Sequence, residues 1–316
     1  MPYSKILPIS SYLNGIHAQF QAYLNEGHPL CPMRNLNYSR CNIPDYSDVH
    51  FQQYYLLRYA YSYAFEYKDM YLNLFQPGIS PMLNDNGQLT VTSIGCGAML
   101  DYWALAHFLE NAGIPQTPIS YQGIDLVNWD ERNRVPGRVQ DCVRFCQENV
   151  VSTLSQKQQL DSHIYFFPKS ISEFTEPDFS QLCNLFAAKP FTFPQVHMMI
   201  SIRAQTETEE IDSKRAERLR QAVCRNGFTS NPLFLYRVPD ERKETKIRDV
   251  DPNFPLPREI IRTLTSLYSR CSCYPEDSNG CPSDSDKQAC EKELGWYPIL
   301  RMSNMRYILL TFKRSV

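Results

Sequence analysis

The residues best suited to chemistry lie in segment 89–101, where Gly95 and Gly97 separate an apolar run from a helical pattern. The run at 89–94 is uncharged and rich in β-branched residues, which predicts a strand followed by a tight turn and a helix. Glycines let a backbone approach a ligand closely, and the first N–H groups of a helix lack intrahelical partners. The turn therefore predicts a site for the acceptor atoms of a ligand.

A carboxylate follows on the next predicted strand. The helix after the turn ends near Gly113 and Pro115, and a second strand is predicted at 119–126. In a β-α-β unit, Asp125 near the end of that strand lies beside the glycine turn and can accept two hydrogen bonds from a ribose. The segment thus predicts a nucleoside site. The alternative is a unit in which the glycines serve geometry alone and Asp125 is a solvated strand end.

The type of nucleoside depends on the residues around the turn. The dinucleotide fingerprint has a third glycine where this chain has Leu100, which disfavours a pyrophosphate. Ser-Ile-Gly-Cys-Gly from Ser93, with Asp125 on the next strand, instead resembles the first two motifs of class I S-adenosylmethionine (SAM) dependent methyltransferases. The resemblance covers residues 89–129. The family often has an acidic residue in place of Ser93 and a glycine in place of Met99.

The resemblance implies a SAM site built from the turn and the strand ends beside it. Asp125 would hold the ribose, and Ser170, after a strand predicted at 163–167, would meet the adenine. Asp101 would cap its helix or meet the amino group of the ligand. The implied cofactor-binding residues are Ser93, Gly95, Cys96, Gly97, Asp101, Asp125, Leu126, Ser170 and Ile171. Direct methyl displacement needs positioning and desolvation more than an acid or a base, so no catalytic residue is assigned.

The acceptor side is expected after a strand at 196–202, counted as the fourth. Arg203 and Gln205 could orient an acceptor there, or Arg203 could cap the following helix or pair with Glu209 and Glu210. The loop lacks the Asn-Pro-Pro-Tyr or Asp-Pro-Pro-Tyr tetrad of base amino-group methylation, which disfavours a DNA adenine substrate. The acceptor stays unidentified, with a small molecule slightly favoured over protein or RNA.

The order of predicted elements indicates an α/β fold with an appended cap. Residues 1–80 predict a helical cap with helices at 10–26 and from Ser47 or Asp48 to Leu74. Residues 81–316 alternate strands and helices, and two strands at 296–302 and 306–313 are expected to form an antiparallel hairpin. This order resembles the seven-stranded, mostly parallel Rossmann-like methyltransferase sheet with its reversed last strand.

Two helical patterns in this scheme carry notable side chains. A helix is predicted at 139–151, where Cys142 and Cys146 on an apolar stripe are interpreted as small buried side chains rather than metal ligands. The long cap helix carries seven tyrosines, which either pack or line an acceptor pocket beneath a lid. Packing is favoured for most of them: Tyr54, Tyr55, Tyr59, Tyr61, Tyr63, Tyr67 and Tyr71.

Four of the eleven cysteines, Cys271, Cys273, Cys281 and Cys290, fall in a polar loop at 271–291. They could bind a tetrahedral zinc, but their spacing lacks the paired Cys-x2-Cys knuckles of a strong zinc motif. Unligated thiols are favoured over zinc or a disulfide. Any metal is expected to be structural, because the loop is predicted at the amino ends of the strands, opposite the ligand crevice.

Bulk composition limits the remaining functions. The 32 basic and 34 acidic residues create no global field for nucleic acid, and no run approaches a membrane span. An odd cysteine count without a signal-like start indicates a reducing, cytoplasmic setting. The leading hypothesis is a SAM-dependent methyltransferase. The rivals are a non-catalytic Rossmann-like protein whose tyrosine-rich cap binds a partner, and a nicotinamide-dependent oxidoreductase, which Leu100 and the closing hairpin disfavour.

Overall fold

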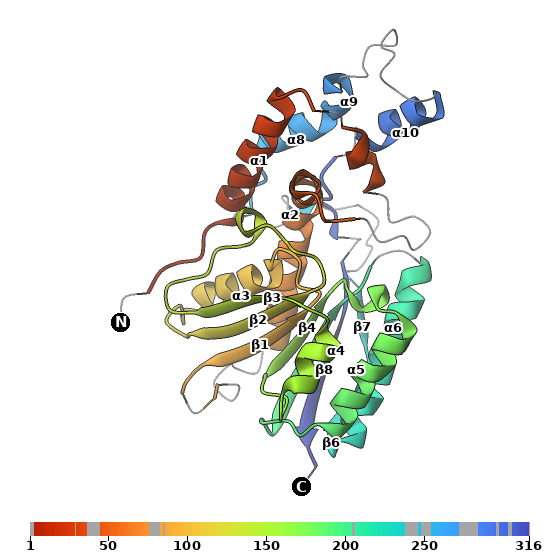
Figure 1. The fold of residues 1–316 in the computed structure, drawn as a ribbon. Helices are drawn as coiled ribbons and strands as arrows, with labels where there is room; N and C mark the ends of the chain where they lie inside the picture. Colours follow the sequence, from red (N-terminus) through yellow and green to blue (C-terminus); the bar gives the residue numbers. More distant parts are fainter. Residues whose placement is uncertain are drawn as a thin grey trace.

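A computed structural model of the chain describes residues 3–28, 30–36, 45–75, 83–84, 86–203, 206–237, 246–247, 254–271, 284–294, 297–302 and 305–315. It shows a twisted sheet with helices on both faces and a helical cap over one end (Figure 1). Within these ranges, no helix has the length and apolar character needed to cross a membrane.

Among the described residues, the sheet contains eight strands in the order β3-β2-β1-β4-β5-β8-β6, with β7 also paired to β8. Strands β1 to β5 are parallel to one another, and β8 runs antiparallel to β5, β6 and β7. This arrangement confirms the predicted Rossmann-like class with a reversed last strand. The strands are β1 Leu89–Ile94, β2 Ile119–Asp125, β3 Cys142–Gln147, β4 Ile164–Pro168, β5 Gln195–Ser201, β6 Phe228–Ser230, β7 Leu235–Arg237 and β8 Arg306–Arg314.

The helix predicted at 139–151 was wrong, because this segment contains β3. Strand β3 pairs with β2 from Ser120 opposite Cys142 to Asp125 opposite Gln147, and α4 (Val150–Gln156) begins only afterwards. The side chains of β3 alternate between exposed and half-buried over most of the strand, as expected for a strand at the edge of a sheet. Cys142 is exposed and Cys146 is half-buried, so neither is the fully buried side chain that was expected.

The predicted closing hairpin was also wrong in its first strand. Residues 297–300 form no strand, and the N–H of Ile299 donates instead to the carbonyl of Arg58 in the cap at 2.9 Å. Strand β8 has a better partner in β5, along which seven residue pairs align from Gln195 opposite Lys313 to Ser201 opposite Tyr307. The short β6 and β7 extend this antiparallel part, which gives eight strands instead of seven.

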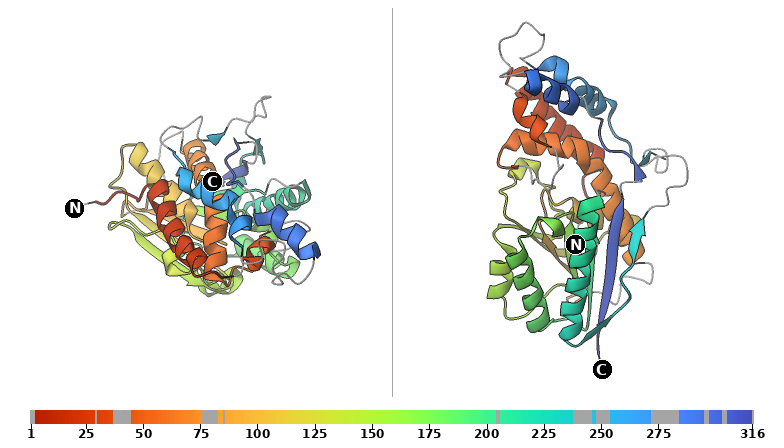
Figure 2. Two further views of the ribbon diagram at one scale, coloured as in Figure 1. Left: turned by 90° about the horizontal axis from the view of Figure 1, so that it is seen from above. Right: turned by 90° about the vertical axis from the view of Figure 1, so that its right-hand side faces the viewer.

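The cap is built from α1 (Ile9–Asn25) and α2 (Val49–Leu74), with α8 (Arg258–Thr265), α9 (Leu267–Arg270) and α10 (Asp284–Leu294) beside them (Figure 2). The Asp48 carboxylate caps α2 by accepting the N–H groups of His50 and Phe51 at 2.7 and 2.8 Å. Part of the cysteine loop predicted at 271–291 is helical, because α10 begins at Asp284. Helices α9 and α10 lie with the cap rather than at the amino ends of the strands, where the loop was expected.

Two apolar cores lie on the two faces of the sheet. Helix α2 and α3 (Leu100–Asn111) cover one face, and α4, α5 (Glu176–Ala188) and α6 (Thr206–Arg225) cover the other. Five tyrosines of α2 are buried, whereas Tyr55 and Tyr63 are half-buried, so packing is confirmed for most of them. Helix α2 also reaches the carboxyl ends of two strands, where Glu66 contacts Lys169 after β4 and Gln52 contacts Asn128 after β2.

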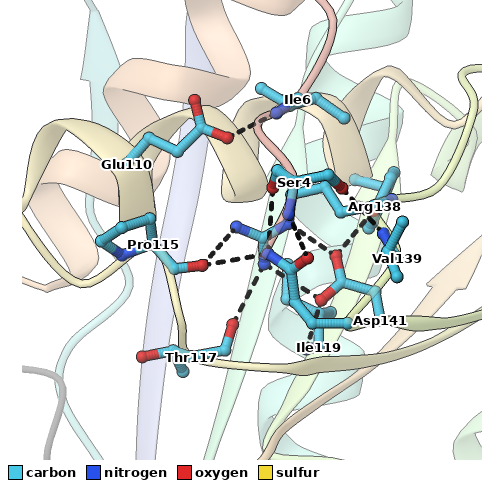
Figure 3. Close-up of polar contacts among 11 residues, drawn as sticks. Ser4, Ile6, Glu110, Pro115, Thr117, Ile119, Arg138, Val139 and Asp141 are labelled. Carbon is cyan, nitrogen blue, oxygen red and sulfur yellow. Dashed lines mark hydrogen bonds and ion pairs between the residues drawn. The ribbon is translucent and has the colours of Figure 1, made fainter. Parts of the chain in front are cut away.

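A polar cluster at the amino ends of β2 and β3 fixes the N-terminal segment (Figure 3). Arg138 and Asp141 form an ion pair at 2.8 Å, and both side chains are fully buried. The Ser4 hydroxyl accepts the Val139 N–H at 2.9 Å, and the Ile6 N–H donates to Glu110 at 2.5 Å. These bonds anchor the chain that leads into α1, and thereby the cap, to the body.

Candidate functional site

The glycine turn forms where it was predicted, between β1 and α3. Gly95 and Gly97 have φ angles of +71° and +52°, in the left-handed region that favours glycine. A Cβ on Gly95 would lie 2.4 Å from the Cβ of Ser170, and one on Gly97 would lie 3.5 Å from the ring of Trp129. The turn therefore needs glycine both for its backbone conformation and, at Gly95, because a side chain of the protein itself approaches closely.

Asp125 lies beside this turn, as expected. Its carboxylate accepts the N–H of Gly97 at 2.8 Å with one oxygen and the N–H of Val127 at 2.9 Å with the other. Burial raises the pKa of Asp125, and these backbone N–H groups oppose the shift. A carboxylate offers about four acceptor positions, so Asp125 can hold the turn and still accept hydrogen bonds from a ligand.

A cavity of about 180 Å³ opens at the carboxyl ends of β1 to β4. Four of the residues predicted to bind a cofactor line it together: Gly95, Asp125, Leu126 and Ser170. Strands β1 and β4 are neighbours, and the chain reverses its direction of winding between them. Ligands of open α/β sheets bind at such a switch point.

The lining of the cavity combines acidic and apolar residues. It contains the carboxylates of Asp125, Glu148, Glu173 and Asp178, and no Lys or Arg among the described residues. Leu126 lines it with 69% of its surface exposed. These features favour a ligand with hydroxyl or amino donors and an apolar part, and they disfavour a phosphate.

Glu148 and Asn149 are lining residues that the sequence analysis missed. The N–H of Glu148 donates to the carbonyl of Asp125 at 2.9 Å, and the side chain of Asn149 caps α4 by accepting the Val151 N–H at 2.8 Å. They follow β3, so the wrong helix prediction concealed a strand end. The available signal was Asn149 itself, an N-cap residue directly before an apolar pair.

Five predicted residues do not line the cavity: Ser93, Cys96, Gly97, Asp101 and Ile171. Asp101 is fully buried and accepts the hydroxyl of Tyr121 with both oxygens, at 2.9 and 3.1 Å. Burial raises the pKa of Asp101 to about 6. Burial likewise raises the pKa of the Cys96 thiol, which lies against Gly123 of β2.

The acceptor-side prediction needs a correction in strand count. Because β3 precedes it, the strand before Arg203 is the fifth of the chain, and β4 is the fourth. The Arg203 guanidinium pairs with Glu173, which lines the cavity, rather than with Glu209 or Glu210. Those two acids pair with other residues: Glu209 with Arg237 and Arg306, and Glu210 with Lys214. Gln205 lies outside the described residues.

The cysteines proposed as metal ligands are only partly described. Cys271 and Cys290 are buried free thiols, whereas Cys273 and Cys281 lie outside the described residues. In the part of the chain that the structure describes, no three His, Cys, Asp or Glu side chains gather in a way that could hold a metal.

Comparison with known proteins gives matches only among solved structures. No family model and no curated protein matches the chain. It is similar to a SAM dependent methyltransferase from Archaeoglobus fulgidus, with 13% identity, a TM-score of 0.36, and coverage of 72% of this chain and 87% of that one. It is also similar to the 1,6-didemethyltoxoflavin-N1-methyltransferase of Burkholderia thailandensis, with 14% identity, a TM-score of 0.33, and coverage of 81% and 91%.

A third similar structure is the [4+2]-cyclase SpnF, with 12% identity, a TM-score of 0.39, and coverage of 99% of this chain and 98% of that one. The fold follows from the topology of this chain itself. Its strand order 3-2-1-4-5-8-6, its reversed C-terminal strand and its N-terminal helices give it the Rossmann-like fold of class I SAM-dependent methyltransferases.

Proposed function

We propose that this protein is a SAM-dependent methyltransferase that binds SAM at the cavity beside the glycine turn. The observation that carries the proposal is the position of Asp125, whose carboxylate lines that cavity and is hydrogen-bonded to Gly97 of the turn. A ribose diol at a strand end next to such a turn is the ligand that this arrangement suits. The acceptor is unidentified, and a small molecule is favoured.

The residues around the cavity fit the parts of the proposed ligand. Asp125 would accept the ribose hydroxyls, and exposed Leu126 with Phe174 would cover the adenine. Glu148 and Asn149 would offer the acceptor and the donor that an adenine edge requires. Ser170 would close the wall next to Gly95. Cys96 and Gly97 would form the turn, and the buried side chains of Ser93, Asp101 and Ile171 would support the site without lining the cavity.

SAM supplies a transferable methyl group on a sulfonium when it is bound. The carboxylates that line the cavity favour a ligand with positive charge and disfavour the pyrophosphate of a nicotinamide cofactor. The task of the chain is to orient the ligand and exclude water. The rival function, a non-catalytic protein whose cap binds a partner, predicts no methyl transfer.

Removing the charge of Asp125 tests the proposed site. In Asp125→Asn we expect the Kd for S-adenosylhomocysteine (SAH), measured by calorimetry, to rise about tenfold or more, because charge-assisted hydrogen bonds to the ribose are lost. Thermal unfolding checks that the variant is folded, since Asp125 also accepts two backbone N–H groups. Asp161→Asn, an exposed acid paired with Lys157, is the matched control and keeps the wild-type affinity. Equal affinity in Asp125→Asn would remove the ribose assignment.

A further inference from the structure

Lys169 has a backbone conformation that is rare for its residue type. Among the described residues, only Met99 and Lys169 have a positive φ without being glycine, at 62° and 58°. They follow β1 and β4, the two neighbouring strands whose ends border the cavity. Left-handed backbone at a residue with a side chain is unfavourable and persists only where the surroundings hold it.

The side chain of Lys169 forms a buried ion pair with Glu66. Its ammonium donates to both carboxylate oxygens of Glu66, at 3.0 Å each, and to the carbonyl of Ile202 at 2.8 Å. Glu66 lies on α2 with 1% of its side chain exposed, and it also accepts the hydroxyl of Ser201. The ring of Tyr63 lies 5.1 Å from the ammonium. The pair therefore joins the cap helix to the ends of β4 and β5.

The next residue, Ser170, reaches in a different direction. Its hydroxyl donates to the carbonyl of Ile94 at 2.5 Å, and its Cβ fills the space that a side chain on Gly95 would need. Ser170 also lines the cavity. Two consecutive side chains thus connect to the cap and to the glycine turn, and the first of them has the left-handed backbone.

We propose that Lys169 is a positioning residue for the cavity. Its ion pair with Glu66 holds the strained backbone that sets Ser170 against the glycine turn, so the cap shapes the cavity wall without touching the ligand. The nature of the ligand rests on the proposed function, whereas the positioning of Ser170 does not. In this proposal, the charge of Lys169 acts only by fixing the backbone conformation. A residue that adopts this conformation without strain should therefore keep Ser170 in place without the charge.

Two double variants separate backbone conformation from charge. Glu66→Gln is combined with Lys169→Gly in one protein and with Lys169→Met in the other. Neither protein then keeps an unpaired buried carboxylate. The amide oxygen introduced at position 66 can still accept the Ser201 hydroxyl. Glycine adopts a φ near 58° without steric cost, whereas methionine, like any residue with a Cβ, adopts it only with strain. Hydrogen exchange of amides 95–99 and 170–174 without ligand, SAH affinity by calorimetry, and chemical unfolding are measured in both and in the wild type.

We expect the glycine variant to keep SAH affinity and amide protection within about threefold of the wild type, and the methionine variant to lose about tenfold in both. A purely structural role would make affinity follow the measured stability, irrespective of the residue at 169. Equal SAH affinity and equal amide protection in the glycine and methionine variants would overturn the proposal. If the methionine variant does not fold, the glycine variant is compared with the wild type alone, and a loss of more than about threefold in SAH affinity and amide protection would overturn the proposal. If the wild type does not bind SAH, the proposed function fails, and the exchange data alone decide the role of Lys169.

Discussion

At the scale of single residues, the carboxylate of Asp101 makes stability depend on pH. It is fully buried behind the glycine turn, and its neighbours are the hydroxyls of Tyr121 and Ser93 and the N–H groups at the start of α3. Burial raises its pKa from 3.8 to about 6. When the pKa of an acid is higher in the folded than in the unfolded state, the acid contributes its full stabilisation at pH values below the unfolded pKa. That contribution is lost as the pH rises through about 6.

Asp101→Asn should remove this dependence. We expect the free energy of unfolding of the variant, relative to the wild type, to rise between pH 4 and pH 7 by on the order of 2 to 3 kcal/mol. Urea unfolding at both pH values measures it, and the exposed Asp161→Asn serves as the control with a constant difference. If the free energies of unfolding of the wild type and Asp101→Asn changed in parallel with pH, ionisation of Asp101 would not be the cause of the loss of stability.

At the scale of elements, close packing between the turn and β2 depends on Gly123. A Cβ there would lie 2.7 Å from the sulfur of Cys96 and 3.1 Å from the ring of Tyr121. The residue that fills this space therefore comes from the glycine turn itself. The sequence analysis assigned Cys96 to cofactor binding, whereas the structure shows it buried in this contact.

Gly123→Ala is expected to destabilise the protein by about 1 to 3 kcal/mol, because the added methyl overpacks the contact. Combining it with Cys96→Ala removes the sulfur and should recover part of that loss. Gly15→Ala is the matched control: it lies in α1 with nothing within 4 Å of an added Cβ, and the same change should stabilise by about 0.5 to 1 kcal/mol. Chemical unfolding measures all three, and a neutral Gly123→Ala would contradict the packing geometry.

Predictions of helices and strands were confirmed where local sequence signals were strong. They were wrong where pairing with another strand determines the structure. The run at 89–94, Gly95 and Gly97 predicted the strand, turn and helix that the structure contains. The segment at 142–147 satisfied a helical spacing by coincidence, and its strand exists because the edge of β2 needs a partner. That single error hid Glu148 and Asn149 and shifted the strand count before Arg203.

At the scale of the whole molecule, the cap and the sheet are joined through one core and several polar contacts. Helix α2 contributes Glu66 to Lys169 after β4, and Gln52 to the carbonyl of Asn128 after β2 at 3.1 Å. Long-range contacts of this kind leave no local pattern, which is why the sequence predicted a cap at 1–80 without its contacts. For the same reason, it paired the last strand with its neighbour in the chain rather than with β5.

Binding of the nucleoside part of SAM in the cavity beside Asp125 is tested most directly by calorimetric titration of the wild-type protein with SAH, with NAD as the comparison. We predict saturable binding of one SAH per chain and no binding of NAD, whose pyrophosphate would meet a cavity lined by carboxylates. Absence of SAH binding, or tighter binding of NAD than of SAH, would contradict the proposed site.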